Sequence, residues 1–197
     1  MKKVIILILS ICVAMCALSA CKSSCKIKET DKYQLLNSML EENYSQITIS
    51  VNNTFTDEDI TLESVYTVKY SQTEITVEYK VERFASLSLD NPTTEVKTVI
   101  EGTATIKDGV VSGGEDAGIT ADIAKIGLSF KEQYFKNVLY TGKYISADVT
   151  DASGFLGTEL TCTDMHVEAK FNKVFTSIEI SYVQGGNEVE YSYVFNS

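Results

Sequence analysis

The chain is poor in the residues and motifs that most often mark catalytic or nucleic-acid-binding proteins. It has one histidine, one proline and no tryptophan, and it contains no HExxH, Walker, GxSxG or dinucleotide-binding motif. Its 17 basic residues are outnumbered by 27 acidic ones, and a net charge of −10 repels phosphate backbones. We therefore expect a protein that is not an enzyme, needs no cofactor and does not bind nucleic acid.

One long apolar segment is present, and it lies at the N-terminus. Lys2 and Lys3 precede an almost wholly apolar run over residues 4–20, the pattern of a secretory signal peptide. The run ends in Leu18-Ser19-Ala20-Cys21, which resembles the lipobox of bacterial lipoproteins. The alternative is an uncleaved signal anchor in which Cys21 carries no lipid.

The lipobox resemblance implies a membrane anchor and a location outside the cytoplasm. It implies that residues 1–20 are removed as a signal peptide and that the Cys21 thiol receives a diacylglyceryl group, whose two acyl chains suffice for stable anchoring. The polar residues 21–30 then form a lipidated tether at the cell membrane or envelope. Cys25 and Cys162 remain as thiols. We expect no structural disulfide, and whether the two pair stays open.

Residues 31–197 have the pattern of one β-rich domain. Apolar spacing predicts a helix over about 31–43, with Tyr33, Leu36 and Leu40 on one face and Leu35 and Met39 beside them. Alternating polar and apolar residues then predict eight or nine strands with one polar face each, as in an antiparallel sheet.

Turn signals and a possible capping box complete this fold prediction. Asp108-Gly109 and Gly185-Gly186 predict hairpin turns. Ser129 and Glu132 resemble a capping box, which predicts a short central helix over about 130–137. Residues 151–157 are expected to form a turn or one helical turn. The predicted class is α+β, mainly β: a curved antiparallel sheet or half-barrel with an N-terminal helix and a short central helix.

This order of elements, together with the lipobox, resembles the LolA-like lipoprotein carriers. The resemblance implies a strongly curved sheet with helices over its concave side, which holds an acylated molecule. Six tyrosines fall on the strand rows that face inward. They are Tyr66, Tyr70, Tyr79, Tyr182, Tyr191 and Tyr193. Because a buried tyrosine hydroxyl needs a polar partner, these residues either line a ligand pocket or cap the core with their hydroxyls toward water.

The single histidine lies in a row of potential metal ligands. Strand alternation places Cys162, Asp164, His166 and Glu168 on one face of a strand predicted over 161–171. Such a row suits zinc or copper, and a Cys–His pair suits a nucleophile. The opposite row is apolar and is the expected core face, so we interpret the polar row as solvated, with no metal site.

The sequence thus supports two functional hypotheses. The first is a lipid-anchored, non-enzymatic protein that binds a lipid or another amphipathic small molecule in its concave sheet. The second is an envelope or surface interaction module, such as an adhesin, a complex subunit or an inhibitor, with a filled core and an envelope protein as partner. A cavity of ligand size favours the first, and a filled core with an exposed apolar patch favours the second.

Overall fold

The computed structural model describes residues 29–55, 60–86 and 94–197, and most of these residues lie in a single ten-stranded antiparallel sheet. The strands are β1 (Gln46–Phe55), β2 (Ile60–Tyr70), β3 (Ile75–Ser86), β4 (Thr94–Lys107), β5 (Val110–Ser112), β6 (Phe135–Tyr140), β7 (Tyr144–Val149), β8 (Thr163–Phe171), β9 (Phe175–Gln184) and β10 (Asn187–Asn196). The signal peptide, Cys21 and most of the predicted tether lie outside the described residues.

Five short helical elements accompany the sheet. They are the α-helices α2 (Glu29–Leu40) and α3 (Ala152–Leu156) and the 3-10 turns η1 (Glu115–Ala117), η2 (Ala121–Ala124) and η3 (Glu132–Tyr134). Among the helices in the described part of the chain, none combines the length and the apolar character that crossing a membrane requires.

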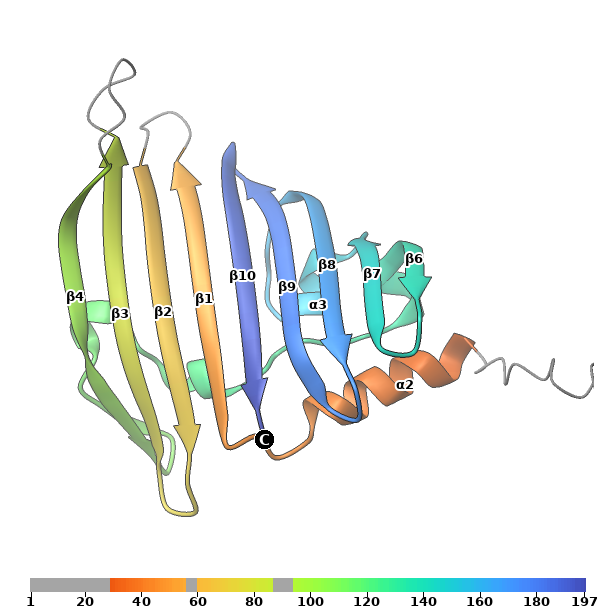
Figure 1. The fold of residues 1–197 in the computed structure, drawn as a ribbon, viewed down its shortest axis with the longest axis horizontal. Coiled ribbons are helices and arrows are strands. Elements are labelled where there is room, and N and C mark those ends of the chain that lie inside the picture. Colours follow the sequence, from red (N-terminus) through yellow and green to blue (C-terminus); the bar gives the residue numbers. More distant parts are fainter. Residues whose placement is uncertain (1–28, 56–59, 87–93) are drawn as a thin grey trace, which may run out of the picture.

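The sheet consists of two five-stranded meanders joined at their first and last strands. The strand order is β5-β4-β3-β2-β1-β10-β9-β8-β7-β6, so β1 and β10 are neighbours in the centre, and β5 and β6 form the two edges (Figure 1). The β1–β10 pairing runs from Gln46 opposite Asn196 to Thr54 opposite Glu188. The segment between β5 and β6 therefore has to cross from one edge to the other, and it does so behind the sheet in the view of Figure 1.

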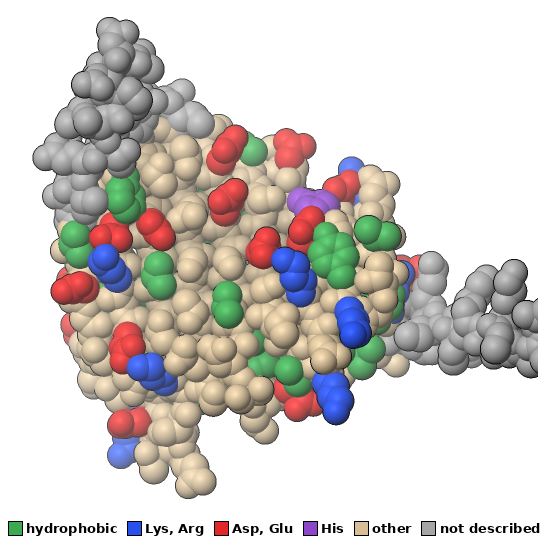
Figure 2. Space-filling view, viewed as in Figure 1, with side chains coloured by type: hydrophobic (Ala, Val, Ile, Leu, Met, Phe, Trp, Pro, Cys, Tyr) green, Lys and Arg blue, Asp and Glu red, His purple; other side chains and the backbone are tan. Residues whose placement is uncertain are grey.

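One face of the sheet is covered and the other is open. The covered face packs against α2, α3 and the crossing segment, and it carries two hydrophobic clusters. The larger one joins α2 and α3 to β6–β10 and the start of β1, around Leu36, Phe130, Phe155 and Phe175. The smaller one joins β2–β4 to η1 and η2. Figure 2 shows the open face, which carries acidic and basic side chains and the histidine.

The predicted fold class is confirmed: the protein is mainly β, with an antiparallel sheet, an N-terminal helix and a short central helix. The two hairpins form where they were predicted, with positive φ at Asp108, Gly109, Gly185 and Gly186. The N-terminal helix ends at Leu40 rather than near 43.

Two details of the prediction are wrong. Leu35 is 40% exposed, whereas Met39 shares the buried face of α2 with Leu36. The helix expected over 130–137 is only the single turn η3, after which Phe135 begins β6. The ring of Phe135 packs on those of Tyr33 and Phe155, with centroids 5.9 and 5.3 Å apart, and this tertiary packing outweighs the local capping signal.

The side chain of Asn37 joins α2 to the crossing segment through two hydrogen bonds to one backbone residue, the pattern that pairs neighbouring strands. Its Nδ2 donates to the carbonyl oxygen of Phe130 at 2.7 Å, and its Oδ1 accepts from the Phe130 backbone N–H at 2.8 Å. Both groups of Phe130 are thus satisfied by one side chain. The pair holds the end of the crossing segment against the helix that covers the larger cluster.

Replacement Asn37→Ala is expected to lower the free energy of unfolding by about 1–3 kcal/mol, because it leaves two half-buried backbone groups without partners. The matched control is Gln34→Ala, at an exposed position of the same helix. Urea unfolding of both variants measures the difference. Equal stability of the two variants would contradict the role given to Asn37.

Candidate functional site

Three cavities surround the middle of the crossing segment on the covered face. We call residues 117–128 the strap, because they lie over the central strands without filling the space beneath them. The largest cavity, of about 570 Å³, lies between the strap and the loop after α3, and a second of about 340 Å³ lies on the side of β1 and β2. A third of about 210 Å³ lies at the C-terminal end of α2. A strap that is only partly packed thus leaves room for a ligand.

The cavities lie where the two hydrophobic clusters meet. Ile49 of β1 and Tyr70 of β2 pack against both clusters, while the strap residues Ile119 and Ile123 belong to the smaller one and Ile126 and Leu128 to the larger one. The boundary between the clusters therefore runs beneath the strap. A boundary between two separately packed cores is a place where space remains unfilled.

Four of the six predicted tyrosines form the floor of the two larger cavities. Tyr191 and Tyr193 of β10 border both, Tyr66 borders the second, and Tyr182 borders the largest. The strand register brings them together, because Tyr66 and Tyr193 flank Ile49 from β2 and β10. We call these four residues the tyrosine floor.

The other two tyrosines have different surroundings. Tyr70 borders the smallest cavity and donates a hydrogen bond from its hydroxyl to the carbonyl oxygen of Ala124 at 3.0 Å. Tyr79 borders none of the three cavities. Its ring lies over Gly102, where an added Cβ would come within 3 Å of it, and its hydroxyl donates to Asp116 Oδ1 at 2.9 Å. Tyr79 thus anchors η1 and is a core residue rather than a pocket residue.

Burial raises the pKa of two hydroxyls of the tyrosine floor, those of Tyr182 and Tyr193. Burial raises the pKa of Tyr193 to about 12, with a smaller contribution from Tyr191. Burial also raises the pKa of Tyr182 far above its ordinary value, and the hydroxyl of Tyr191 adds to the effect. The rings of Tyr182 and Tyr191 stack with centroids 6.2 Å apart. The floor is therefore apolar and aromatic, with a few neutral donors.

The rim of the cavities carries one ion pair. Lys125 Nζ and Asp122 Oδ1 lie 2.8 Å apart on the strap, both side chains are more than 70% exposed, and both residues border the two larger cavities. An exposed pair of this kind contributes little to stability. It leaves a cationic and an anionic group at the mouth of an apolar cavity.

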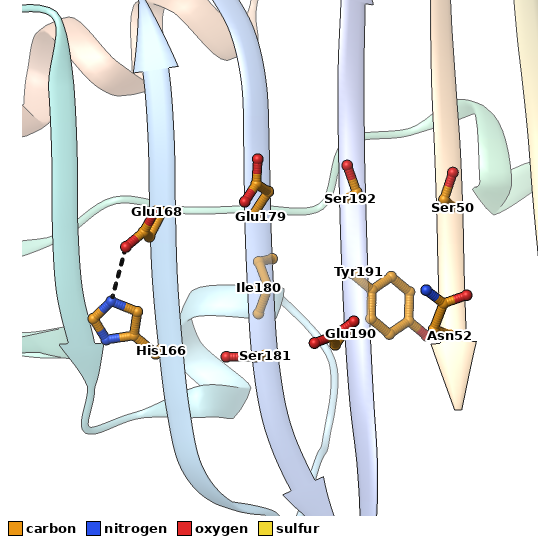
Figure 3. A pocket seen from close by; sticks show the side chains of 10 residues that line it. All are labelled: Ser50, Asn52, His166, Glu168, Glu179, Ile180, Ser181, Glu190, Tyr191 and Ser192. Atoms are coloured by element: carbon orange, nitrogen blue, oxygen red, sulfur yellow. Dashed lines mark ion pairs between the residues drawn. The ribbon is translucent and has the colours of Figure 1, made fainter. Parts of the chain in front are cut away.

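The predicted row of Cys162, Asp164, His166 and Glu168 does not form. A β-bulge between Thr163 and His166, with Asp164 at φ 54°, changes the alternation of β8. Cys162 consequently packs against the larger cluster on the covered side, and burial raises the pKa of its thiol. His166 and Glu168 stay on the open face, beside a shallow hollow of about 340 Å³ (Figure 3).

Metal ligation finds no support in the part of the chain that the structure describes. Within residues 29–55, 60–86 and 94–197, no group of three or more histidine, cysteine or acidic side chains is placed to hold a metal ion. Cys162, the one cysteine within these ranges, forms no disulfide with another described residue. Cys25 lies outside the described residues, so the structure does not test whether it pairs with Cys162.

The strap is the part of the site that sequence reasoning missed. The sequence of residues 112–128 is glycine-rich and by itself predicts only an irregular segment, although Ile119, Ile123, Ile126 and Leu128 recur through it. Apolar residues in an otherwise irregular segment indicate a loop that packs on something. No protein-family model matches the chain, and no curated protein matches it.

The alkaline stability of the protein tests the surroundings of Tyr193. Its pKa is about 12 in the fold and has an ordinary value of 10.0, so between these values the unfolded chain releases a proton that the folded chain keeps. The free energy of unfolding of the wild type should therefore fall as the pH rises through this interval. In Tyr193→Phe, which has no hydroxyl to titrate, this fall should be smaller.

Urea unfolding of both proteins at about pH 8 and about pH 11 makes the comparison. Tyr182→Phe serves as a second variant with the same expected direction, since the pKa of Tyr182 is also raised by burial. An identical alkaline loss in the wild type and in both variants would show that these hydroxyls are not buried as described.

Proposed function

We propose that the protein is a lipid-anchored, extracytoplasmic binding protein that holds an apolar or amphipathic molecule beneath the strap. The observation that carries the proposal is the cavity of about 570 Å³ over the tyrosine floor, with a second of about 340 Å³ beside it. Ligand pockets in proteins commonly have volumes of about 300–1,000 Å³ and mostly apolar linings with a few polar groups. At this site the molecule is bound and carried, without chemical conversion.

The lining favours an amphipathic ligand over a purely apolar one. Leu128, Leu156 and Leu160 face the aromatic floor across the largest cavity and suit a hydrocarbon or ring system. The neutral Tyr193 hydroxyl can donate one hydrogen bond to a ligand, and Lys125 and Asp122 lie at the rim. A ligand with an apolar body and one polar end satisfies both regions.

The strap offers a route for the ligand. Among the side-chain hydrogen bonds described for the strap, one joins its middle to the sheet. In this bond the Tyr70 hydroxyl of β2 donates to the carbonyl oxygen of Ala124. Beyond its two ends, Asp116 is held by Tyr79 and Phe130 by Asn37. Between these points the strap is held by its apolar side chains and by few hydrogen bonds, so it opens at lower cost than a segment hydrogen-bonded throughout.

The second hypothesis, an envelope interaction module, has less support. Within the described residues, the large apolar side chains that are exposed lie on five different elements and not on one patch. They are Leu35, Val99, Val110, Leu139 and Val194. Scattered single residues of this kind are normal on protein surfaces. An interaction module remains the alternative that the ligand experiment decides.

A bound amphiphile is expected to co-purify with residues 26–197 from a bacterial lysate. This chain lacks Cys21, so no acyl group of its own can occupy the cavity. Native mass spectrometry should show an adduct that solvent extraction releases as a lipid or another amphiphile. After extraction, the dye 1-anilinonaphthalene-8-sulfonate should bind with one site per chain and fluoresce.

Leu160→Trp tests where the dye binds, because the larger side chain occupies the cavity of about 570 Å³. We expect this variant to weaken dye binding about tenfold or more, equivalent to about 1.4 kcal/mol. Leu139→Trp is the matched control at an exposed position of β6. Equal binding by both variants, or an empty wild-type chain that binds no dye, would favour the interaction module.

Lipidation is tested by the pair Cys21→Ser and Cys25→Ser in the full chain. We expect the full chain to incorporate radiolabelled palmitate and to fractionate with membranes. Cys21→Ser should lose the label, because the thiol that receives the diacylglyceryl group is gone, whereas Cys25→Ser should keep it, since Lys22 replaces the aliphatic residue that a lipobox needs. Retention of label by Cys21→Ser would contradict the anchor.

A further inference from the structure

The open face carries a hydrogen-bonded series of three side chains that the ligand site does not use. Asp148 Oδ1 lies 2.9 Å from His166 Nδ1, and His166 Nε2 lies 3.0 Å from Ser146 Oγ. Ser146 and Asp148 are two residues apart on β7, and His166 pairs with Asp148 from β8. Register alone therefore brings an acid, an imidazole and a hydroxyl into one line.

The direction of these hydrogen bonds follows from the acid. Hydrogen bonds from His166 and Asn137 lower the pKa of the Asp148 carboxyl, so it is ionised and can only accept. His166 Nδ1 must then donate to Asp148, and in the neutral imidazole Nε2 accepts the proton of the Ser146 hydroxyl. This tautomer is the one in which a histidine removes a proton from a serine. Glu168 Oε1, 3.8 Å from Nε2, forms an ion pair with the imidazole once Nε2 is protonated (Figure 3).

Two residues with positive φ lie at β-bulges next to these three side chains. Asn137 Nδ2 donates to the second carboxylate oxygen of Asp148 at 2.7 Å, and Asn137 has φ 53° at a bulge in β6. Asp164, with φ 54°, forms the bulge in β8 directly before His166. Positive φ in residues other than glycine is costly, and bulges next to catalytic sites redirect side chains.

Solvent can reach these side chains, and His166 connects them to a hollow that Ser146 and Asp148 themselves do not border. His166 and Asp148 are 37% and 36% exposed, and His166 borders the hollow that continues over β9 and β10 to β1 (Figure 3). Hydroxyls and carboxylates line this hollow, among them Ser181, Ser192 and Glu179. Hydroxyl-rich molecules fit such a lining. Tyr144 lies beside Ser146 and Glu168 on this face.

We propose that Ser146, His166 and Asp148 form a serine-esterase site on the open face, acting on small acyl esters of hydroxylated alcohols. Ser146 Oγ adds to the ester carbonyl carbon while its proton passes to His166 Nε2. The carbon–oxygen bond to the alcohol then breaks as Nε2–H protonates the leaving oxygen. Water next attacks the acyl-serine with proton transfer to Nε2, and release of the carboxylic acid regenerates the Ser146 hydroxyl.

Each residue has a distinct role in this reaction. Ser146 and His166 are catalytic residues, because they exchange the proton and form the bond. Asp148 is a positioning residue, which acts through the tautomer and orientation of His166. The glutamates beside the hollow disfavour anionic substrates, since Glu168, Glu179 and Glu190 all border it. Neutral esters are therefore the expected class.

The test uses the full-length chain, purified in mild detergent, with p-nitrophenyl acetate and a fluorophosphonate probe. We expect hydrolysis of the ester and phosphonylation of Ser146, located by peptide mass spectrometry. Ser146→Ala should lower the rate about tenfold or more and abolish labelling, because the nucleophile is removed. Ser177→Ala, at a serine of β9 that does not border the hollow, should keep both.

The role of Asp148 needs a separate readout. Asp148→Asn should lower kcat and leave KM nearly unchanged, because binding in the hollow does not involve this side chain. Thermal unfolding of each variant establishes that it is folded. Hydrolysis by Ser146→Ala at the wild-type rate, or a labelled residue other than Ser146, or no label on the folded wild type, would each overturn the proposal. All three outcomes leave the ligand site beneath the strap untouched.

Discussion

The pairing of β1 with β10 is the constraint on which the rest of the structure depends. It joins two meanders that would otherwise be separate five-stranded sheets, and it places β5 and β6 at opposite edges. The chain must then cross the full width of the sheet, about 43 Å for nine strand spacings. Residues 113–134 span this distance, since they reach roughly 70 Å when fully extended. The strap is therefore a consequence of the strand order.

The strap also explains why the protein has cavities rather than one continuous core. Each meander packs its own hydrophobic cluster, with α2 and α3 over one and η1 and η2 over the other. A crossing segment with short 3-10 turns and glycines has few large side chains to fill the boundary. The tyrosine floor lies at this boundary, where side chains with one polar end tolerate partial exposure.

Local patterns in the sequence predict the fold class, two of its turns and the inward side of most strands. Alternation placed Tyr66, Tyr182, Tyr191 and Tyr193 on one side of the sheet, and Asp108-Gly109 and Gly185-Gly186 specified two turns. The pairing of β1 with β10 has no local signal in the sequence, because the paired residues are far apart in the chain. Gln46 and Asn196, for example, are 150 residues apart. Without that pairing, the sequence predicts an inward row but not which tyrosines meet.

Bulges and edge packing account for the remaining errors. The bulge at Asp164 moves Cys162 to the covered face, and no pattern of polar and apolar residues before His166 indicates the extra residue. Ser129 and Glu132 resemble a capping box, yet β6 begins at Phe135 in place of the expected helix. The ring of Phe135 packs there against those of Phe130 and Phe155. In both places a tertiary contact decided between two local conformations.

The central position of β10 has a consequence for the order in which the chain folds. The two strands that pair at the centre are 150 residues apart at Gln46 and Asn196, so the centre of the sheet stays incomplete until both meanders have been made. Contacts between residues far apart in the sequence form slowly. Deletion of β10 would thus remove the middle of the sheet and not a dispensable edge.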